Sequence, residues 1–206
     1  IPHYPVYLLL GIVLWSYFTE VTTGSINSIV GRGDLIRKIN FPKYVIVLSG
    51  SAAAIINLFL NFIVIGVFLV LSGVDIRLQA LLVIPLIIEL TVFAVALAFF
   101  LSAVFVRFRD VGYIWEVLMQ AAFYATPILY PLTLVPLGAQ KILLLSPMAQ
   151  IIQDMRHALV TPQTVTLGDL YTTRLIWLLP LSAVAVTAIL SVLYFKRRSK
   201  YFAEEV

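Results

Sequence analysis

Long apolar runs separated by short polar segments dominate this chain. Five of these runs come close to the roughly 20 residues that a helix needs to cross a bilayer. They cover residues 4–24, 45–71, 80–106, 111–129 and 175–195. A lipid-exposed chain must satisfy its backbone hydrogen bonds internally, so each run is expected to be a helix. The pattern therefore predicts an all-α, polytopic membrane protein with five membrane-spanning helices.

The pattern breaks down between residues 131 and 160. Proline and glycine interrupt this region, and its apolar pieces, residues 142–145 and 148–160, are too short to cross a bilayer. Broken backbone at membrane depth is tolerated only where it packs inside protein or lines a water-filled cavity. We therefore predict re-entrant or interfacial half-helices on the outer side of the membrane.

Composition supports the membrane class. Of the 206 residues, 62% are hydrophobic and only 12% are charged, which excludes a water-soluble domain of this size. We treat residues 1–206 as a single transmembrane domain. The chain has no cysteine, which excludes disulfides and thiolate metal sites.

The basic residues orient the predicted helices. Ten of the 14 lysines and arginines fall in the segments expected inside: Arg32, Arg37, Lys38, Lys43, Arg107, Arg109, Lys196, Arg197, Arg198 and Lys200. Such a bias places these segments, and the C-terminus, in the cytoplasm. The net charge of +4 then reflects topology rather than nucleic-acid binding. Five spans put Ile1 outside, which requires an exported N-terminus or a preceding span, and we expect the preceding span.

The basic loop at residues 31–44 has a helical pattern of its own. Asp34 is expected to cap a short helix that Pro42 ends. Apolar side chains share one side of this helix and basic ones follow towards its C-terminal end: Leu35, Ile36 and Ile39, then Arg37 and Lys38. An amphipathic helix on a cytoplasmic loop indicates a docking surface for another protein or for anionic lipid. The alternative is a loop that only sets topology.

Motifs for catalysis are absent from the sequence. It contains no Gly-rich Lys-Ser/Thr phosphate loop, no HExxH and no GxSxG, and its two histidines are far apart. We therefore predict that the chain is not an enzyme and binds no metal or cofactor itself. Glu89 and Glu116 should face the bundle interior, water or an arginine. Asn57 and Asn61, four residues apart, share a face and are expected to join helices.

Two groups of residues are candidates for contact with a transported molecule. Aromatic side chains and one acid could line a path and stack on sugar rings: Trp15, Tyr17, Phe18, Phe123, Tyr124, Tyr130 and Glu89. Ordinary core or interfacial positions are an equal alternative for the rings. Arg32, Arg37, Arg107 and Arg109 could attract an anionic head group, or they could simply set topology.

Several segments, taken in order, resemble one known family. They are GIVLWSYF at 11–18, LIRKINFP at 35–42, VRFRDV at 106–111, TPILYP at 126–131 and SPM at 146–148. Each is weak alone, but together they cover nearly the whole chain. The sequence resembles the permease subunit of type-2 ABC exporters, especially those that move lipid-linked polysaccharides.

The resemblance implies a six-span permease that forms a homodimer and pairs with two copies of a nucleotide-binding ATPase, on which ATP and Mg would bind. The coupling helix of the family matches Asp34, Leu35, Ile36, Arg37, Lys38, Ile39, Asn40 and Phe41. The outer gate helices match residues 131–160. Two features depart from the family: its first span is missing here, and Ser146 stands where asparagine is common.

The implied function is ATP-driven export of a lipid-linked polysaccharide, such as O-antigen, capsule or teichoic acid, across the cytoplasmic (inner) membrane of a bacterium. Membrane lipids and the polymer itself would be its remaining partners, with no nucleic acid. An exporter of drugs or lipids is the alternative within this class. A channel or a lipid-modifying enzyme is the alternative outside it.

Overall fold

The computed structural model describes residues 2–38, 41–75 and 77–202, and every regular element in these ranges is helical. The α-helices are α1 (Tyr4–Ile26), α2 (Gly33–Lys38), α3 (Tyr44–Leu71), α4 (Val83–Arg107), α5 (Val111–Ala125), α6 (Leu137–Leu143), α7 (Pro147–Leu159), α8 (Leu167–Leu170) and α9 (Leu178–Arg198). Short 3-10 helices are η1 (Val30–Arg32), η2 (Leu78–Leu82), η3 (Leu132–Leu134) and η4 (Arg174–Trp177). The prediction of an all-helical chain is confirmed.

Four of the helical segments in the described ranges are long and apolar enough to cross a membrane. They are Tyr4–Ile26, Tyr44–Leu71, Leu78–Arg107 and Leu175–Arg198. The remaining expected span contains α5, which has 15 residues. At 1.5 Å per residue α5 is about 22 Å long, short of the hydrocarbon thickness of about 30 Å. The expected span ended at residue 129, but Thr126 precedes Pro127 and is already extended, with φ −80° and ψ 137°.

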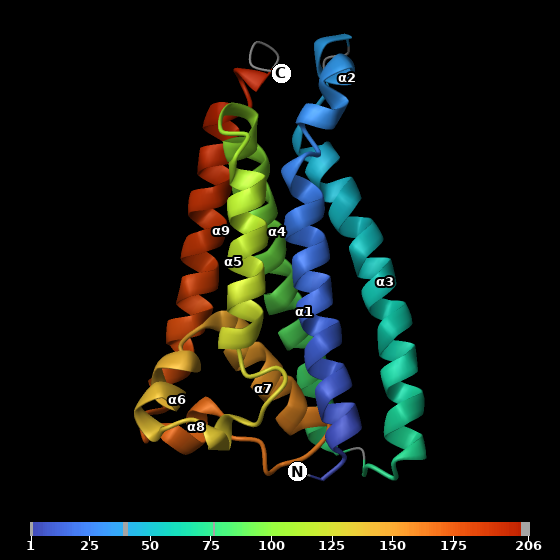
Figure 1. Cartoon of the computed structure of the whole chain (residues 1–206), viewed down its shortest axis with the longest axis vertical. Coiled ribbons are helices and arrows are strands. Elements are labelled where there is room, and N and C mark those ends of the chain that lie inside the picture. Colours follow the sequence, from blue (N-terminus) through green and yellow to red (C-terminus); the bar gives the residue numbers. More distant parts are fainter. Residues whose placement is uncertain (1, 39–40, 76, 203–206) are drawn as a thin grey trace.

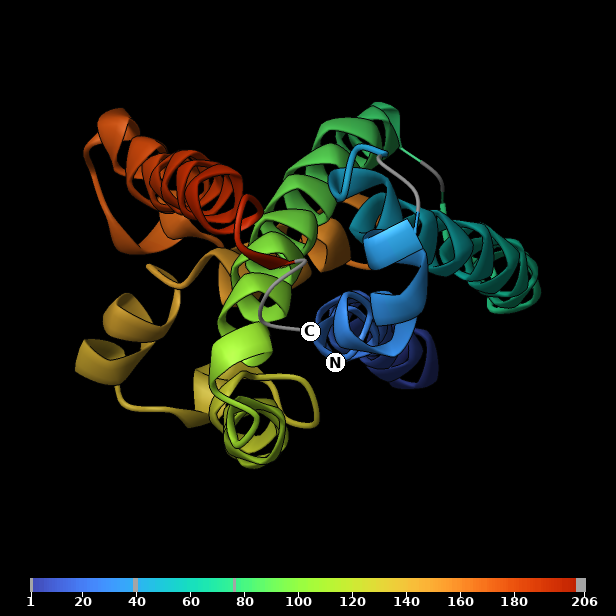
Figure 2. The ribbon, with the colours of Figure 1, turned by 90° about the horizontal axis from the view of Figure 1, so that it is seen from above.

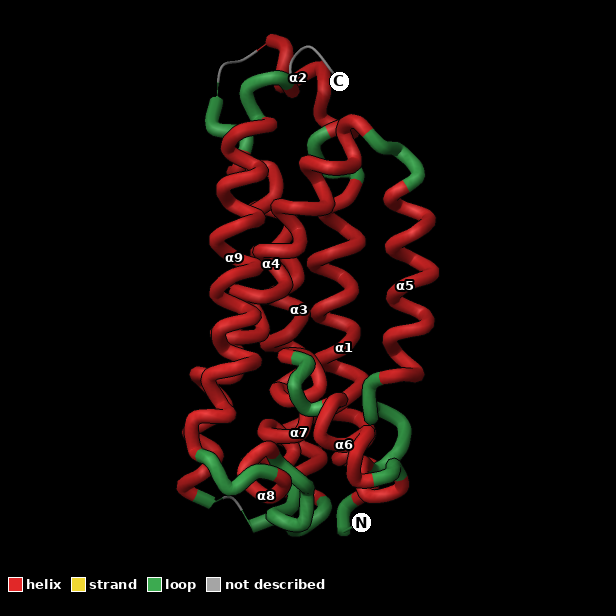
Figure 3. Tube along the Cα trace, turned by 90° about the vertical axis from the view of Figure 1, so that its left-hand side faces the viewer, coloured by secondary structure: helices red, strands yellow, loops and turns green. Residues whose placement is uncertain are grey.

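The two ends of the bundle differ in character. At one end lie α2, the connection from α4 to α5 and the C-terminus, and at the other lie α6, α8 and the N-terminus (Figures 1 and 3). Arg32, Lys43, Arg107, Arg109 and Lys196 therefore gather at one end, which we call the basic end. The other we call the short-helix end. Residues expected on one side of the membrane thus share one end of the bundle, and the assignment of that end to the cytoplasm stays a prediction.

Helices α1 and α4 form the centre of the bundle. Helix α1 contacts α3, α4, α5 and α7, whereas α4 also contacts α9, and the view along the bundle shows α3 and α4 on neighbouring sides of α1 (Figure 2). Phe18 of α1 stacks on Phe93 of α4, with 5.5 Å between ring centroids. Five small residues of α4 are buried against neighbouring helices: Ala94, Ala96, Ala98, Ser102 and Ala103. Their short side chains let the backbone of α4 approach its neighbours.

One of the two asparagines of α3 joins helices. Asn57 Nδ2 donates to Glu20 Oε1 of α1 at 2.7 Å, whereas Asn61 Nδ2 donates to the Asn57 carbonyl within α3. The expectation that these residues join helices is confirmed for Asn57 only. Asn61 satisfies its amide locally, as polar side chains in membrane helices often do.

Candidate functional site

A groove of about 520 Å³ runs between α1 and α5. We call it the α1–α5 groove. Its lining is Trp15, Thr19 and Thr23 from α1 with Glu116, Met119, Gln120, Phe123 and Tyr124 from α5. The lining residues recur every fourth position on α1 and at spacings of three and four on α5, so each helix presents one continuous face to the groove.

The aromatic part of the groove is a chain of three rings. Trp15 meets Phe123 edge to face at 5.9 Å between centroids, and Phe123 meets Tyr124 in the same way at 5.5 Å. Exposure rises along this chain, from 8% for Trp15 to 69% for Tyr124. The rings therefore extend from the packed interior to an open surface, where ring faces are free for a ligand.

Polar side chains accompany these rings. Thr23, Glu116 and Gln120 are exposed in the groove, and the Thr19 hydroxyl is buried with no hydrogen-bond partner among the described residues. Together they offer hydroxyl, carboxylate and amide groups beside apolar ring faces. This combination fits ligands that have both C–H faces and hydroxyl groups.

Packing at the basic end fixes α5 against α1. Trp115 Nε1 donates to the Thr22 hydroxyl of α1 at 3.2 Å. One turn earlier, a Cβ at Gly112 would lie 3.3 Å from the Phe105 ring and 3.7 Å from the Ile26 side chain. The small residue at Gly112 lets α5 approach α1 and α4 closely, which sets the width of the groove at this end.

The other four predicted path residues lie outside the groove. Tyr17 and Phe18 are buried on the side of α1 that faces α4, where the Tyr17 hydroxyl lies 3.1 Å from the Thr91 hydroxyl. The Tyr130 hydroxyl donates to the carbonyls of Tyr124 and Ala125 and thereby fastens the turn after α5. Glu89 lines a separate pocket between α4, α7 and α9. For these four residues, contact with a transported molecule stays a prediction.

A buried arginine forms a second centre at the short-helix end, which the sequence reasoning missed. Arg156 of α7 is 0% exposed. Its guanidinium donates to the carbonyls of Tyr7 (3.0 Å), Pro127 (2.6 Å) and Ile128 (2.7 Å), and it lies 3.6 Å from the centroid of the Tyr7 ring. These contacts tie α1, the turn after α5 and α7 together. A buried charge requires such compensation to be tolerated.

The residues of the predicted coupling helix are described in part. Asp34 lies within the first turn of α2, because the helix begins at Gly33, two residues earlier than a capping role for Asp34 requires. Ile36 is buried and Phe41 half-buried. The side chains of Leu35, Arg37 and Lys38, and all of Ile39 and Asn40, lie outside the described residues.

The arginines proposed for head-group attraction have individual contacts. Arg32 Nη1 reaches the Ile46 carbonyl (3.4 Å) and the Ser49 hydroxyl (3.3 Å), so it also joins η1 to α3. Arg107 and Arg109 are exposed and lie over the rings of Phe108 and Phe105. Glu116 and Glu89 line cavities whose walls contain neither Arg107 nor Arg109. An arginine was one of the partners considered for these two glutamates. The described residues give no support for pairing of either glutamate with Arg107 or Arg109.

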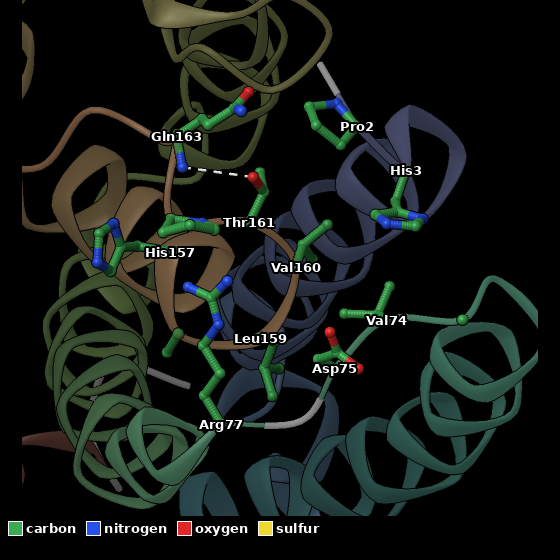
Figure 4. Close-up of a pocket in the computed structure, with 13 residues that line it drawn as sticks. Pro2, His3, Val74, Asp75, Arg77, His157, Leu159, Val160, Thr161 and Gln163 are labelled. Carbon is green, nitrogen blue, oxygen red and sulfur yellow. Dashed lines mark hydrogen bonds between the residues drawn. The ribbon is translucent and has the colours of Figure 1, made fainter.

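A small pocket of about 240 Å³ opens at the short-helix end beside the N-terminus. Figure 4 shows the Arg77 side chain directed towards His157 and Thr161, with Asp75 and His3 on the other side. The Gln163 backbone N–H donates to the Thr161 hydroxyl at 3.3 Å across its rim. Both charge signs meet here. The described residues include no cluster of three His, Cys, Asp or Glu that could bind a metal ion.

Comparison with known proteins identifies the family. Residues 3–160 match the family model described as ABC-2 type transporter. The chain is 31% identical over 157 residues to the O-antigen export system permease protein RfbA of Klebsiella pneumoniae, an alignment that covers 76% of this chain and 61% of that protein. It is 28% identical over 211 aligned positions to the RfbA protein of Myxococcus xanthus, covering 100% of this chain and 77% of that protein.

These relatives are longer than the chain described here, which spans about three fifths of the Klebsiella protein and about three quarters of the Myxococcus one. The family match itself extends over most of this chain, from α1 to the C-terminal end of α7. The motifs that suggested the resemblance, from 11–18 to 146–148, all fall inside it. The chain belongs to the ABC-2 type transporter family.

Proposed function

We propose that this chain is the membrane-spanning permease of an ATP-driven exporter that moves a lipid-linked polysaccharide across the cytoplasmic membrane of a bacterium. Membership of the ABC-2 type transporter family and the names of the O-antigen export relatives support this assignment. The polymer could be of the O-antigen, capsule or teichoic acid type.

The α1–α5 groove is the observation that carries the proposal. A sugar ring has apolar C–H faces, which stack on aromatic rings, and a rim of hydroxyl groups, which bond to polar side chains. The groove supplies Trp15, Phe123 and Tyr124 for the first kind of contact and Thr23, Glu116 and Gln120 for the second. Its volume of about 520 Å³ accommodates more than one sugar ring.

The proposed topology places the basic end in the cytoplasm. Four helical segments cross the membrane directly, and α5 with the turn that follows it makes the fifth crossing. In this arrangement Arg32, Arg37, Arg107 and Arg109 attract the anionic head group of the lipid carrier at the cytoplasmic surface. The region 131–160, with α6 and α7, forms the re-entrant outer gate, for which the position of these short helices gives support.

The chain has no phosphate-binding loop, so a partner must supply ATP hydrolysis. We assign the loop 31–44 as its docking segment: α2 projects at the basic end between α1 and α3 (Figure 1). Closure of two ATPase subunits around ATP and Mg would displace α2, and α1 would transmit the movement to the groove wall. A homodimer of permeases would match the two ATPase subunits by symmetry.

The transport experiment uses cells that lack the gene and carry the full-length protein on a plasmid. The variant Phe123→Ala/Tyr124→Ala removes two groove rings, and the control Tyr113→Ala/Val117→Ala removes exposed α5 side chains that do not line the groove. We expect surface polysaccharide to fall at least fivefold only in the groove variant, with lipid-linked polymer accumulating inside. Unchanged export at equal protein levels would overturn the assignment of the groove as the polymer path.

A further inference from the structure

A pocket of about 390 Å³ lies between α4, α7 and α9 and shares no residue with the α1–α5 groove. We call it the α4–α7–α9 pocket. Its walls are largely apolar, with Leu86, Trp177 and Leu181 among them. Its polar side chains are Gln79, Glu89, Gln150, Asp154, His157 and Thr166.

Two of these polar side chains are deeply buried and incompletely bonded. Asp154 is 7% exposed and Gln150 is 3% exposed. Gln150 Nε2 donates to Asp154 Oδ2. Asp154 Oδ1 and Gln150 Oε1 then have no hydrogen-bond partner among the described residues. An unpaired buried acceptor lowers stability, so a ligand that donates hydrogen bonds to these two oxygens would be stabilised here.

The neighbouring groups are also acceptors. His157 Nδ1 lies 3.2 Å from the Thr164 carbonyl, which can only accept, so Nδ1 carries the proton and Nε2 offers a lone pair in the neutral ring. The Thr166 hydroxyl donates to Asp169 Oδ2 at 2.9 Å and accepts from the Asp169 backbone N–H, so it has no proton left to donate into the pocket. Glu89 adds a second carboxylate. Among the described residues that line the pocket, the remaining donors are the amide of Gln79, the second N–H of Gln150 and the indole N–H of Trp177.

Hydrogen-bond acceptors outnumber donors in this pocket, and two of its side chains are carboxylates. A cation with several N–H donors therefore suits it best. The described residues include no group of three His, Cys, Asp or Glu suited to a metal ion. A primary ammonium group needs only three acceptors, which Glu89, Asp154 and Gln150 provide. Burial raises the pKa of the Asp154 carboxyl to about 7, and a cation beside it would return it to the ionised form.

The surroundings of the pocket indicate where such an ammonium group comes from. Trp177 and Leu181 line its α9 side, and Leu82 and Leu86 its α4 side. Beside them Leu81, Leu178 and Leu179 are exposed apolar residues. In a membrane these side chains meet lipid, and a tryptophan among them is typical of the interface where head groups lie.

We propose that the α4–α7–α9 pocket binds a primary ammonium group, supplied by the ethanolamine head group of a phospholipid from the membrane leaflet at the short-helix end. Glu89 and Asp154 neutralise the ammonium charge, Gln150 accepts one of its protons, and Leu82, Leu86 and Trp177 contact the adjoining apolar part of the lipid. Because α7 carries both Asp154 and Arg156, the lipid stabilises the helix that joins α1 to the turn after α5.

The experiment measures thermal unfolding of the full-length purified protein in detergent with added lipid. Phosphatidylethanolamine is compared with phosphatidylcholine, whose trimethylated nitrogen has no N–H, and with free ethanolamine. Glu89→Gln and Asp154→Asn are the test variants, and Glu116→Gln, an acid in the α1–α5 groove, is the control. We expect phosphatidylethanolamine to raise the unfolding temperature of wild type and control by roughly 5 °C more than phosphatidylcholine does. Each pocket variant should lose this difference.

Equal shifts from the two lipids in wild type would overturn the proposal, and this arm needs no variant to fold. A preference that survives in both pocket variants would also overturn it. If free ethanolamine alone gave the full shift, the ammonium site would stand but the lipid source would be wrong. The measurement involves neither ATPase nor transport, so its outcome is separate from that of the proposed export function.

Discussion

Gly11 of α1 lies directly against the guanidinium of Arg156. A Cβ at position 11 would overlap Nη2 and would lie 3.1 Å from Cζ. The absent side chain thus makes room for the Arg156 guanidinium, which donates to one carbonyl of α1 and to two carbonyls of the turn after α5. A glycine in the middle of a helix normally lowers stability by about 1 kcal/mol, and here the space it leaves explains its presence.

We predict that Gly11→Ala destabilises the protein by about 2–3 kcal/mol, because the guanidinium must move away from its carbonyls. The matched control is Gly66→Ala in α3, where an added Cβ meets nothing within 4 Å. Thermal unfolding of both variants in one detergent measures the difference. Equal unfolding temperatures for the two variants would show that the close approach of Gly11 to Arg156 is unimportant.

Arg156→Lys is expected to loosen the short-helix end even though it keeps the charge. A lysine ammonium is a point donor on a single stem and cannot match the fork that reaches Tyr7, Pro127 and Ile128. The free energy of unfolding should fall by about 3 kcal/mol, as it does when other buried charge networks are broken. Because the sequence has no cysteine, a single Leu129→Cys can report on the turn after α5.

We expect the labelling rate of that cysteine by a water-soluble maleimide to rise several-fold when Arg156→Lys is added. A Leu193→Cys reporter on the exposed face of α9 provides the control, and its rate should not change. An unchanged rate at Leu129→Cys would mean that Arg156 does not fasten this turn.

The two asparagines of α3 give a matched pair. Asn57→Leu removes the hydrogen bond to Glu20 of α1, whereas Asn61→Leu removes only a bond to the carbonyl of its own helix. We predict that Asn57→Leu lowers the free energy of unfolding by about 1 kcal/mol, which is typical of interhelical hydrogen bonds in membranes. Asn61→Leu should lower it hardly at all. Unfolding in mixed detergent micelles measures both. A larger effect for Asn61→Leu would contradict the assignment of Asn57 as the residue that joins the helices.

Stability should depend on pH through Asp154. Burial raises the pKa of its carboxyl to about 7, the hydrogen bond from Gln150 opposes this, and the nearby carboxylates of Glu89 on α4 and Asp169 on α8 add to the rise. His157 of α7 also faces the pocket, while the α9 and η4 side contributes only the uncharged Leu181 and Trp177. In the unfolded chain an aspartate ionises near pH 4. The contribution of Asp154 to the free energy of unfolding is therefore fully present below pH 4 and is lost progressively as the pH rises through 7.

Without an ammonium ligand, the unfolding temperature of wild type should fall between pH 5.5 and pH 8.5, and Asp154→Asn should reduce that fall. The rise in unfolding temperature caused by phosphatidylethanolamine should instead be larger at pH 8.5, because the lipid binds more tightly where Asp154 is ionised. Scans at three pH values in phosphatidylcholine, with and without phosphatidylethanolamine, measure both effects. If the unfolding temperatures of wild type and Asp154→Asn changed with pH in parallel, Asp154 would not be the cause of the pH dependence.

Local sequence was enough to predict the long helices. The run at 45–71 became α3, Tyr44–Leu71, and the run at 4–24 became α1, Tyr4–Ile26, because hydropathy and length alone decide where a helix can lie in lipid. The early end of α5 was also readable: Pro127 disfavours helix at Thr126, and the apolar residues that follow concealed this signal.

The sites depend on contacts that no local pattern reveals. Arg156 bonds to carbonyls 149, 29 and 28 residues away, and the short half-helix predicted for residues 148–160 gave no indication of these partners. Of the six candidate path aromatics, only Trp15, Phe123 and Tyr124 line the groove, because the helix face that meets a neighbour is set by packing. One feature of the sequence did point to Arg156. An unpaired charge among apolar residues is costly, so an arginine in such a segment is expected to have partners.

Docking of an ATPase on the loop 31–44 is the central claim of the proposed mechanism, and affinity purification tests it most directly. The full-length protein is isolated from gently solubilised membranes as wild type, as Arg37→Glu/Lys38→Glu, and as the control Lys196→Glu/Arg197→Glu at the same end of the bundle. We predict that an ABC ATPase co-purifies with wild type and control and is reduced at least tenfold in the loop variant. An ATPase that remains bound to the loop variant, or that is absent from wild type in several mild detergents, would contradict the account.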